Sequence, residues 1–227
     1  MRTYFTSILI LVAGFAASCT RQSANVPAAP LIQTATVPAD KLLPGPPQKG
    51  SEQDRADLAE VLRLQKSRTA QDCERARFEN SPNLETLFGP RYPGLLTREQ
   101  VEKLGPAFKR IFDDIRPVVG TAKDRWPRGR PSIEHPEVTP CLERETSGSY
   151  PSGHAMLSTV FAETLAILYP DKKGALAARS RQANEDRVLS GLHYPSDVRD
   201  GEALGRAVFD TLLRNPEFVK LLEGLPK

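Results

Sequence analysis

Three short segments of the sequence hold residues that could together bind and transfer a phosphoryl group. The segments run from Lys123 to Pro131, from Pro151 to His154 and from Arg187 to Asp197, and they contain two of the three histidines of the chain. A phosphate monoester dianion needs several fixed hydrogen-bond donors and positive charges, because phosphoryl transfer depends mainly on positioning and electrostatic stabilisation. The residue types of the three segments therefore suit a phosphoryl-transfer site.

Five residues of these segments are predicted to bind phosphate. Arg130 and Arg187 can each offer a planar pair of donors to two oxygens, and Lys123 adds a compact positive charge. Ser152 and Gly153 stand at the predicted start of an apolar helix, where free amides and the helix dipole favour an anion. Taken singly, each would more often be a surface charge or a helix cap, but their joint occurrence favours a site.

Two histidines and an aspartate are predicted to carry the chemistry. His193 is the predicted nucleophile, because a neutral imidazole can attack phosphorus and form a phosphohistidine. Asp197 would hold the other ring nitrogen and fix the tautomer. His154 would protonate the leaving alkoxide and then activate water. His135 lies outside the pattern and is expected to be a loop residue.

The order and spacing of the segments resemble the three-part phosphate-site motif of the type 2 phosphatidic acid phosphatase superfamily. That superfamily includes bacterial class A nonspecific acid phosphatases and vanadium haloperoxidases. The stretch from Gly148 to His154 is most similar to the class A acid phosphatases, and a looser similarity extends from about Arg68 to Leu213. The resemblance implies the nucleophilic role of His193, hydrolysis of small phosphate monoesters and an acidic to mildly acidic optimum.

The sequence departs from the family pattern at two positions. Ala155 follows the histidine where the class A enzymes usually have threonine, and Asp186 precedes Arg187 where the family usually has serine. Adjacent helical residues diverge by roughly 100°, so Asp186 need not touch the phosphate. A pairing between Asp186 and Arg187 or a neighbour would weaken phosphate affinity, so this position bears on rate and substrate range.

Other functions stay open beside an exported phosphatase of broad specificity. In a vanadium haloperoxidase the counterpart of His193 would coordinate vanadate, although known members are generally much longer than this chain. A lipid-headgroup phosphatase of the same superfamily, or a phosphate-binding lipoprotein without turnover, would keep the same cage. The sequence has neither a paired-cysteine zinc pattern nor a carboxylate cluster suited to two metals, so no metal and no cofactor are predicted.

Composition and charge describe an ordinary globular domain. The chain has 227 residues, of which 39% are apolar and 26% charged, with a net charge of +3. This length allows one domain with a real core or two small ones, and the helical patterns below favour one. The small net charge argues against a general nucleic-acid binder, which would need a strong basic field.

The N-terminal residues are predicted to direct export. Residues 1–18 have a basic start, an apolar run and a small-residue end, as in a signal peptide. Cys19 follows directly and favours lipidation over plain cleavage, which would leave a periplasmic or exported protein tethered to a membrane. Residues 19–50 are rich in proline and alanine and are predicted to be a disordered tether. The folded phosphatase domain is assigned to residues 51–227.

Cys73 and Cys141 remain inside the predicted domain. In an oxidising compartment an even pair can form a disulfide, and this reading is slightly favoured over two separate buried thiols.

The remaining patterns predict an all-α, single-domain bundle around a buried central helix at about residues 154–169. A capping box at Thr97 opens an amphipathic helix that Pro117 should kink or end. Residues 172–190 are expected to form another helix, Ser196 to cap the next, and Asn215 with Pro216 to open the last. Trp126 and Tyr150 could wall the substrate pocket, although packing is the more common role of such aromatic residues.

Overall fold

The computed structural model describes residues 29–227, so the predicted signal peptide and Cys19 lie outside the described residues. Within this range the chain forms helices and no strand. No helix of the described range combines the length and apolar character needed to cross a membrane. The elements are η1 (Thr34–Thr36), α1 (Ala39–Leu42), α2 (Glu52–Ser67), α3 (Ala70–Phe78), α4 (Leu84–Phe88), α5 (Arg98–Arg125), α6 (Pro131–Glu134), α7 (Gly153–Leu168), η2 (Pro170–Lys172), α8 (Lys173–Leu189), α9 (Pro195–Leu212) and α10 (Pro216–Glu223).

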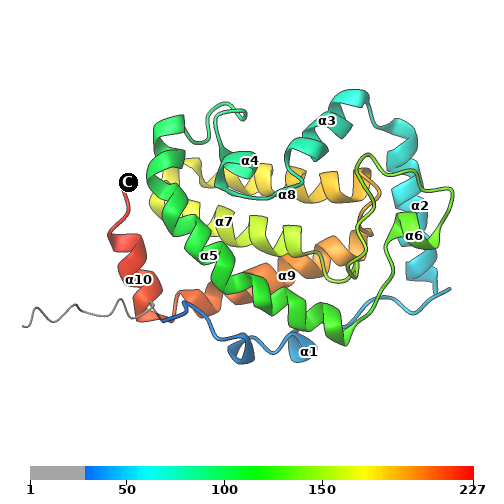
Figure 1. The fold of residues 1–227 in the computed structure, drawn as a ribbon, viewed down its shortest axis with the longest axis horizontal. Coiled ribbons are helices and arrows are strands. Elements are labelled where there is room, and N and C mark those ends of the chain that lie inside the picture. Colours follow the sequence, from blue (N-terminus) through cyan, green and yellow to red (C-terminus); the bar gives the residue numbers. More distant parts are fainter. Residues whose placement is uncertain (1–28) are drawn as a thin grey trace, which may run out of the picture.

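Helix α7 lies at the centre of the bundle, and this confirms the predicted all-α fold around a buried helix (Figure 1). Its side chains are buried on nearly every face because its sequence is almost continuously apolar. Helices α8 and α9 pack against it most extensively, and α5 packs against it as well. Gly201 and Gly205 let α9 approach closely: a Cβ at Gly205 would lie 2.7 Å from the carbonyl oxygen of Met156. The close packing of α7 and α9 fixes the two segments that carry His154 and Asp197.

Helix α5 begins at the predicted capping box, with Thr97 as N-cap, but it runs through Pro117 to Arg125. The sequence predicted that Pro117 would kink or end the helix, and the second of these outcomes is wrong, because α5 does not end there. A proline removes one backbone hydrogen bond. Buried apolar side chains on both sides of it, Ile115 and Val118 among them, keep the helix against the core. Continuation beyond Pro117 is what places Lys123 at the site.

The segment from residue 29 to residue 43 packs on the core, so the predicted disordered tether is wrong for this part of residues 19–50. Leu31, Val37 and Leu43 are buried in the main core cluster. The amide of Leu31 donates to Asp114 Oδ2 at 2.9 Å, and its carbonyl oxygen accepts from the Asn215 side chain at 2.7 Å. The apolar residues here follow no helical period, because short extended pieces and one-turn helices bury them. Periodicity therefore gave no signal of their burial.

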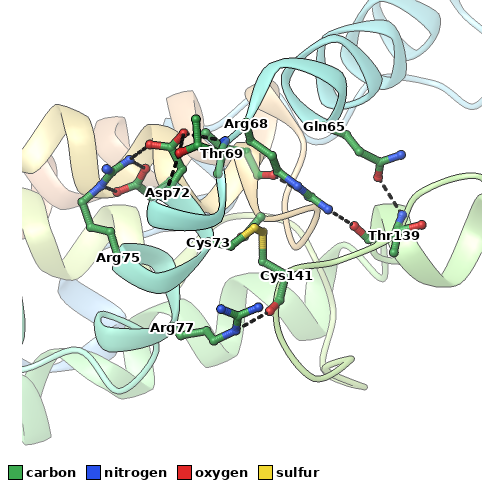
Figure 2. Close-up of a disulfide and its surroundings, with 12 residues drawn as sticks. Gln65, Arg68, Thr69, Asp72, Cys73, Arg75, Arg77, Thr139 and Cys141 are labelled. Carbon is green, nitrogen blue, oxygen red and sulfur yellow. Dashed lines mark hydrogen bonds and ion pairs between the residues drawn. A yellow bond between two sulfur atoms is a disulfide. The ribbon is translucent and has the colours of Figure 1, made fainter.

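Cys73 on α3 and Cys141 form a disulfide that joins segments 68 positions apart in the sequence (Figure 2). Two arginines reinforce the junction: Arg77 Nε donates to the carbonyl oxygen of Cys141 at 2.9 Å, and Arg68 Nη2 donates to that of Thr139 at 2.6 Å. The loop after Cys141 leads to residues 147–154, so this junction anchors one side of the site.

Candidate active site

All eight predicted catalytic and phosphate-binding residues meet at one end of the bundle, where helices α7 and α9 begin and α8 ends (Figure 1). They come from the last turn of α5 (Lys123), the loop before α6 (Arg130), the start of α7 (Ser152, Gly153 and His154), the end of α8 (Arg187), the loop after it (His193) and the first turn of α9 (Asp197). Residues that are up to 74 positions apart in the sequence, Lys123 and Asp197, thus form one cluster.

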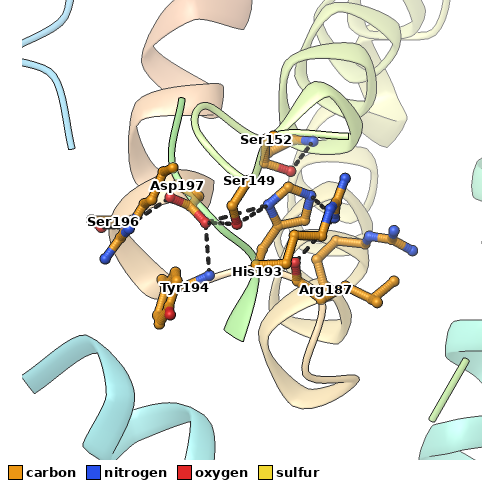
Figure 3. Close-up of polar contacts among 12 residues, drawn as sticks. Ser149, Ser152, Arg187, His193, Tyr194, Ser196 and Asp197 are labelled. Atoms are coloured by element: carbon orange, nitrogen blue, oxygen red, sulfur yellow. Dashed lines mark hydrogen bonds and ion pairs between the residues drawn. The ribbon is translucent and has the colours of Figure 1, made fainter. Parts of the chain in front are cut away.

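His193 is buried, with Asp197 beside one of its ring nitrogens and an arginine beside the other (Figure 3). Its Nδ1 lies 3.4 Å from Asp197 Oδ2, and its Nε2 lies 3.1 Å from Arg130 Nη1. A carboxylate only accepts and a guanidinium only donates, so the network assigns the ring proton to Nδ1 and a lone pair to Nε2. The lone pair needed for nucleophilic attack therefore faces the cationic residues.

Asp197 is held by more partners than His193 alone. Its Oδ2 accepts from the Tyr194 amide at 2.9 Å and from the Ser149 hydroxyl, and its Oδ1 accepts from Arg128 Nη1 at 2.8 Å. Tyr194, not Ser196, is the N-cap of α9, so the predicted cap at Ser196 is wrong. Pro195 occupies the first helical position, so the N-cap lies two residues before the predicted one. The Ser196 hydroxyl instead donates to Asp57.

Arg130 and Arg187 present their guanidinium groups to the same space and are both buried. Arg130 is fixed by the carbonyl oxygens of Ser147 and Leu192, at 2.9 Å and 3.0 Å. Arg187 Nη1 donates to Asn80 Oδ1 at 3.2 Å, whereas its buried Nε has no hydrogen-bond partner within residues 29–227. A buried donor without a partner is costly, and this one would be satisfied by an anionic ligand.

Glu145 is a site residue that the sequence reasoning missed. Its carboxylate bridges the two arginines, 2.5 Å from Arg130 Nη2 and 3.1 Å from Arg187 Nη2. Its side chain is 34% exposed, whereas those of both arginines are almost completely buried. A carboxylate between two arginines stands in chemically for an anionic ligand. No motif signalled Glu145, because it comes from an irregular loop whose path depends on tertiary contacts.

The start of α7 contributes backbone groups and His154. The Ser152 hydroxyl accepts from the Ala155 amide at 3.3 Å, and the Ser152 amide donates to the carbonyl oxygen of Asp197 at 2.9 Å. Gly153 and His154 occupy the first turn, where no preceding helical turn supplies an acceptor for their amides. His154 Nε2 lies 2.7 Å from the carbonyl oxygen of Glu79, so this nitrogen carries a proton.

Burial and mutual repulsion lower the pKa of every basic group on this side of the site. Burial, then Arg130, lowers the pKa of Lys123 to about 8, and burial lowers that of Arg187 to about 10. Burial and the charge of Arg130 hold the pKa of His193 well below its usual range. Burial and the charge of Arg187 do the same to the pKa of His154. The site thus holds an excess of buried positive charge around the neutral imidazoles of His154 and His193. This excess favours the binding of an anion.

Asp186 faces away from the phosphate-binding residues. Both of its oxygens accept from Arg75, at 2.7 Å from Nε and 2.7 Å from Nη2. Its charge is therefore matched by Arg75 on α3 rather than by Arg187, and the departure from the family serine leaves the arginine of the motif available.

Two aromatic residues and the third histidine take packing roles. Tyr150 is completely buried and donates to Asp200 Oδ2 at 2.8 Å, and Trp126 packs edge-on against it at 5.5 Å. Tyr150 therefore does not wall a substrate pocket. His135 directly follows the short helix α6, which the sequence did not predict, and its ring lies 6.3 Å from that of Tyr194. In residues 29–227 no group of three or more potential metal-ligating side chains is present.

The sequence is similar to known phosphatases. No family model matches the sequence. The chain is 27% identical over 195 residues to a non-specific acid phosphatase of Providencia stuartii, covering 80% of this chain and 77% of that protein. It is 36% identical over 106 residues to a non-specific acid phosphatase of Salmonella typhi, covering 45% of this chain and 42% of that protein.

Two solved structures share the fold. A transmembrane PAP2-type phosphatidylglycerolphosphate phosphatase from Bacillus subtilis superposes with a TM-score of 0.53 at 20% identity, over 77% of this chain and 88% of its own. A bacterial vanadium-dependent iodoperoxidase gives a TM-score of 0.53 at 16% identity, over 79% of this chain and 53% of its own.

This chain therefore shares its fold with a PAP2-type phosphatase and with a vanadium-dependent iodoperoxidase. The sequence relatives are bacterial non-specific acid phosphatases, which confirms the resemblance predicted from the three segments. The same relatives confirm the assignment of the chain to the phosphoric monoester hydrolases.

Proposed function

We propose that this protein is an exported, metal-independent acid phosphatase that hydrolyses small phosphate monoesters through a phosphohistidine at His193. The observation that carries the proposal is the geometry of the His193 ring. Nδ1 lies against Asp197, and the Nε2 lone pair points toward Arg130 at 3.1 Å. Lys123, Arg130 and Arg187 supply the positive charge that the transferred group needs, which is the role that metal ions take in other phosphatases.

The reaction would proceed in two displacements at phosphorus. In the first, His193 Nε2 bonds to phosphorus while the ester P–O bond breaks, and the leaving oxygen takes a proton from His154. In the second, His154 removes a proton from water, the water oxygen bonds to phosphorus and the N–P bond breaks. One water is consumed, and one alcohol and one phosphate are formed.

His154 can perform both proton transfers through Nδ1. Its Nε2 is occupied by the carbonyl oxygen of Glu79, so Nδ1 is the nitrogen left to face a substrate. The lowered pKa of His154 belongs to the empty site, where Arg187 repels a second proton. A bound phosphate dianion would offset that repulsion and raise the pKa, so substrate binding prepares the acid.

A small pocket beside His154 could receive the organic part of the substrate. It has a volume of about 150 Å³ and is lined by Gly153 and His154 together with mostly apolar side chains, among them Phe112, Val119 and Leu157. Because His154 is the proposed proton donor to the leaving group, a pocket that His154 lines is the candidate place for that group. Its apolar lining supports monoesters with an aryl or similarly compact apolar group.

The test is a substrate panel on the mature protein across pH, with and without EDTA. We expect p-nitrophenyl phosphate to be hydrolysed best below neutral pH, with full activity in EDTA and inhibition by vanadate. The phosphoenzyme trapped from a labelled substrate should carry an acid-labile phosphoramidate at His193. Strict dependence on added divalent metal would contradict the mechanism, and bromide or iodide oxidation with vanadate and peroxide, without phosphatase turnover, would favour a haloperoxidase.

A lipid-headgroup phosphatase is a second candidate. It is favoured by the predicted lipid tether at Cys19 and by the structural likeness to a phosphatidylglycerolphosphate phosphatase. Phosphorylated lipids in detergent micelles belong in the same panel. A kcat/KM for these lipids at least tenfold above that for p-nitrophenyl phosphate would favour this candidate.

A further inference from the structure

We propose that Asp57 on α2 is a positioning residue for the His193–Asp197 pair and acts through Arg128. The inference rests on the proposed phosphatase function but adds a group that lies outside all three sequence segments.

Arg128 connects the two carboxylates directly. Its Nη1 donates to Asp197 Oδ1 at 2.8 Å, and its Nη2 donates to Asp57 Oδ2 at 3.0 Å. Asp54 Oδ1 accepts from the same Nη2 at 3.1 Å. The Asp197 and Asp57 side chains are 0% and 1% exposed, so neither charge is screened by water. One guanidinium therefore spans two buried carboxylates, and the position of each restricts the other.

Ser196 forms a second connection between Asp57 and the first turn of α9. Its hydroxyl accepts from Arg128 Nη1 at 2.7 Å and donates to Asp57 Oδ2. Asp57 Oδ1 in turn accepts from Gln53 on the same helix at 3.1 Å. The first turn of α9, which carries Asp197, is thus attached to α2 by two routes, through Arg128 and through Ser196.

The backbone of Arg128 holds the remaining partner of Asp197. The carbonyl oxygen of Arg128 accepts from the Ser149 amide at 2.8 Å, and the Ser149 hydroxyl donates to Asp197 Oδ2. The guanidinium also lies 3.9 Å above the ring of Tyr194, whose amide donates to Asp197. A displacement of Arg128 would therefore loosen both oxygens of Asp197, and with them the orientation and tautomer of His193.

This role predicts an effect on turnover without an effect on phosphate binding. The network touches only the Nδ1 side of His193, whereas Arg130 lies against Nε2 and is joined to Arg187 through Glu145. Outer-shell partners of a catalytic histidine typically contribute on the order of 10- to 100-fold. We expect Asp57→Asn and Arg128→Lys each to lower kcat by about this factor, with KM and the inhibition constant of phosphate changed by less than about twofold.

Asp200→Asn is the matched control. Asp200 is also a buried carboxylate on α9, and it binds Arg199 and Tyr150 rather than Asp197. It should lower the thermal midpoint in the same manner as Asp57→Asn while kcat stays near that of the wild type. If the Asp57→Asn protein does not fold, Ser196→Ala carries the test, because it removes one of the two routes and should lower kcat several-fold.

A second measurement separates this inference from the phosphatase proposal. The ring nitrogens of His193 in ¹⁵N-histidine-labelled protein, assigned by His193→Gln, should report the Nδ1–H tautomer in the wild type and a mixture in Asp57→Asn. This signal needs no turnover, so it tests the positioning role even if the substrate panel fails. An unchanged tautomer together with an unchanged kcat would overturn the inference, as would equal effects on kcat and KM or an equal kcat loss in Asp200→Asn.

Discussion

The two sides of the His193 ring are built in opposite ways. On the Nδ1 side, Asp197 has hydrogen-bond donors on both oxygens, and Arg128 spans it to Asp57. On the Nε2 side, Arg130 and Arg187 share one partly exposed carboxylate, that of Glu145, and Lys123 donates to the carbonyl oxygen of Gly148. The Nδ1 side holds more carboxylates than cations, joined by hydrogen bonds, whereas the Nε2 side holds more positive than negative charge.

The pKa values of the arginines show the same contrast. Burial opposes the charge of Arg128, but Asp197 and Asp57 outweigh it and raise the pKa of that guanidinium. Burial lowers the pKa of both Arg130 and Arg187, because their carboxylate contacts do not compensate. A buried positive cluster without matching charge is unfavourable for folding. Its presence therefore points to a ligand that supplies the missing negative charge.

The largest expected effect comes from removing the His193 imidazole, which lies between the Nδ1 side and the Nε2 side. His193→Ala should lower kcat for p-nitrophenyl phosphate by at least about 10⁴-fold, because it removes the nitrogen that forms the N–P bond of the proposed intermediate. His135→Ala is the matched control, since it removes the histidine outside the site and should leave kcat unchanged. Steady-state kinetics on both proteins, with circular dichroism to check folding, measures this. Comparable activity in the two variants would remove His193 from the mechanism.

A smaller effect is expected from weakening the cationic side alone. Arg187→Lys keeps the charge but loses the planar fork and the unpartnered Nε, so kcat/KM should fall by about 10²- to 10³-fold. Arg181→Lys, an exposed substitution on the same helix, serves as control. The KM and the phosphate inhibition constant should rise together with the loss of kcat. A loss confined to kcat would mean that Arg187 positions His193 rather than the phosphate.

The pH profile tests whether the positive side controls the nucleophile. Attack requires neutral His193, so activity falls as the pH drops through the pKa of His193, which burial and then the charges of Arg130 and Lys123 hold low. Lys123→Met removes one repelling charge and should raise that pKa, which moves the acidic limb of kcat/KM to higher pH. Lys109→Met on the exposed face of α5 should leave the limb in place. A shift toward lower pH would contradict the assigned electrostatics.

The smallest effect is expected from Glu145, whose carboxylate lies where a phosphate would bind. Glu145→Gln keeps the size but removes the charge that competes for Arg130 and Arg187. We expect the inhibition constant of inorganic phosphate and KM to fall by about 3- to 10-fold, which corresponds to roughly 1 kcal/mol. Glu143→Gln, two residues earlier and exposed, is the control. Weaker phosphate binding in Glu145→Gln would mean that Glu145 supports the ligand rather than competes with it.

The sequence by itself determined the helical fold and the list of residues that would meet. The apolar run of α7, the capping box at Thr97 and the three segments are local signals, and their interpretation did not depend on distant contacts. The orientation of Asp186 toward Arg75, by contrast, follows from how α3 packs on α8. Sequence adjacency to Arg187 could suggest a contact but could not decide it.

Only the tertiary structure decided what surrounds the nucleophile. Burial of Leu31, the continuation of α5 through Pro117, and the placement of Glu145 and Asp57 all depend on partners far away in the sequence. The physical reason is that the pairing and the pKa of a charged group depend on the charges nearest to it in space. A motif specifies which residues come together, whereas the packing of helices that bear no motif determines which side of His193 holds the carboxylate network and which is left for the ligand.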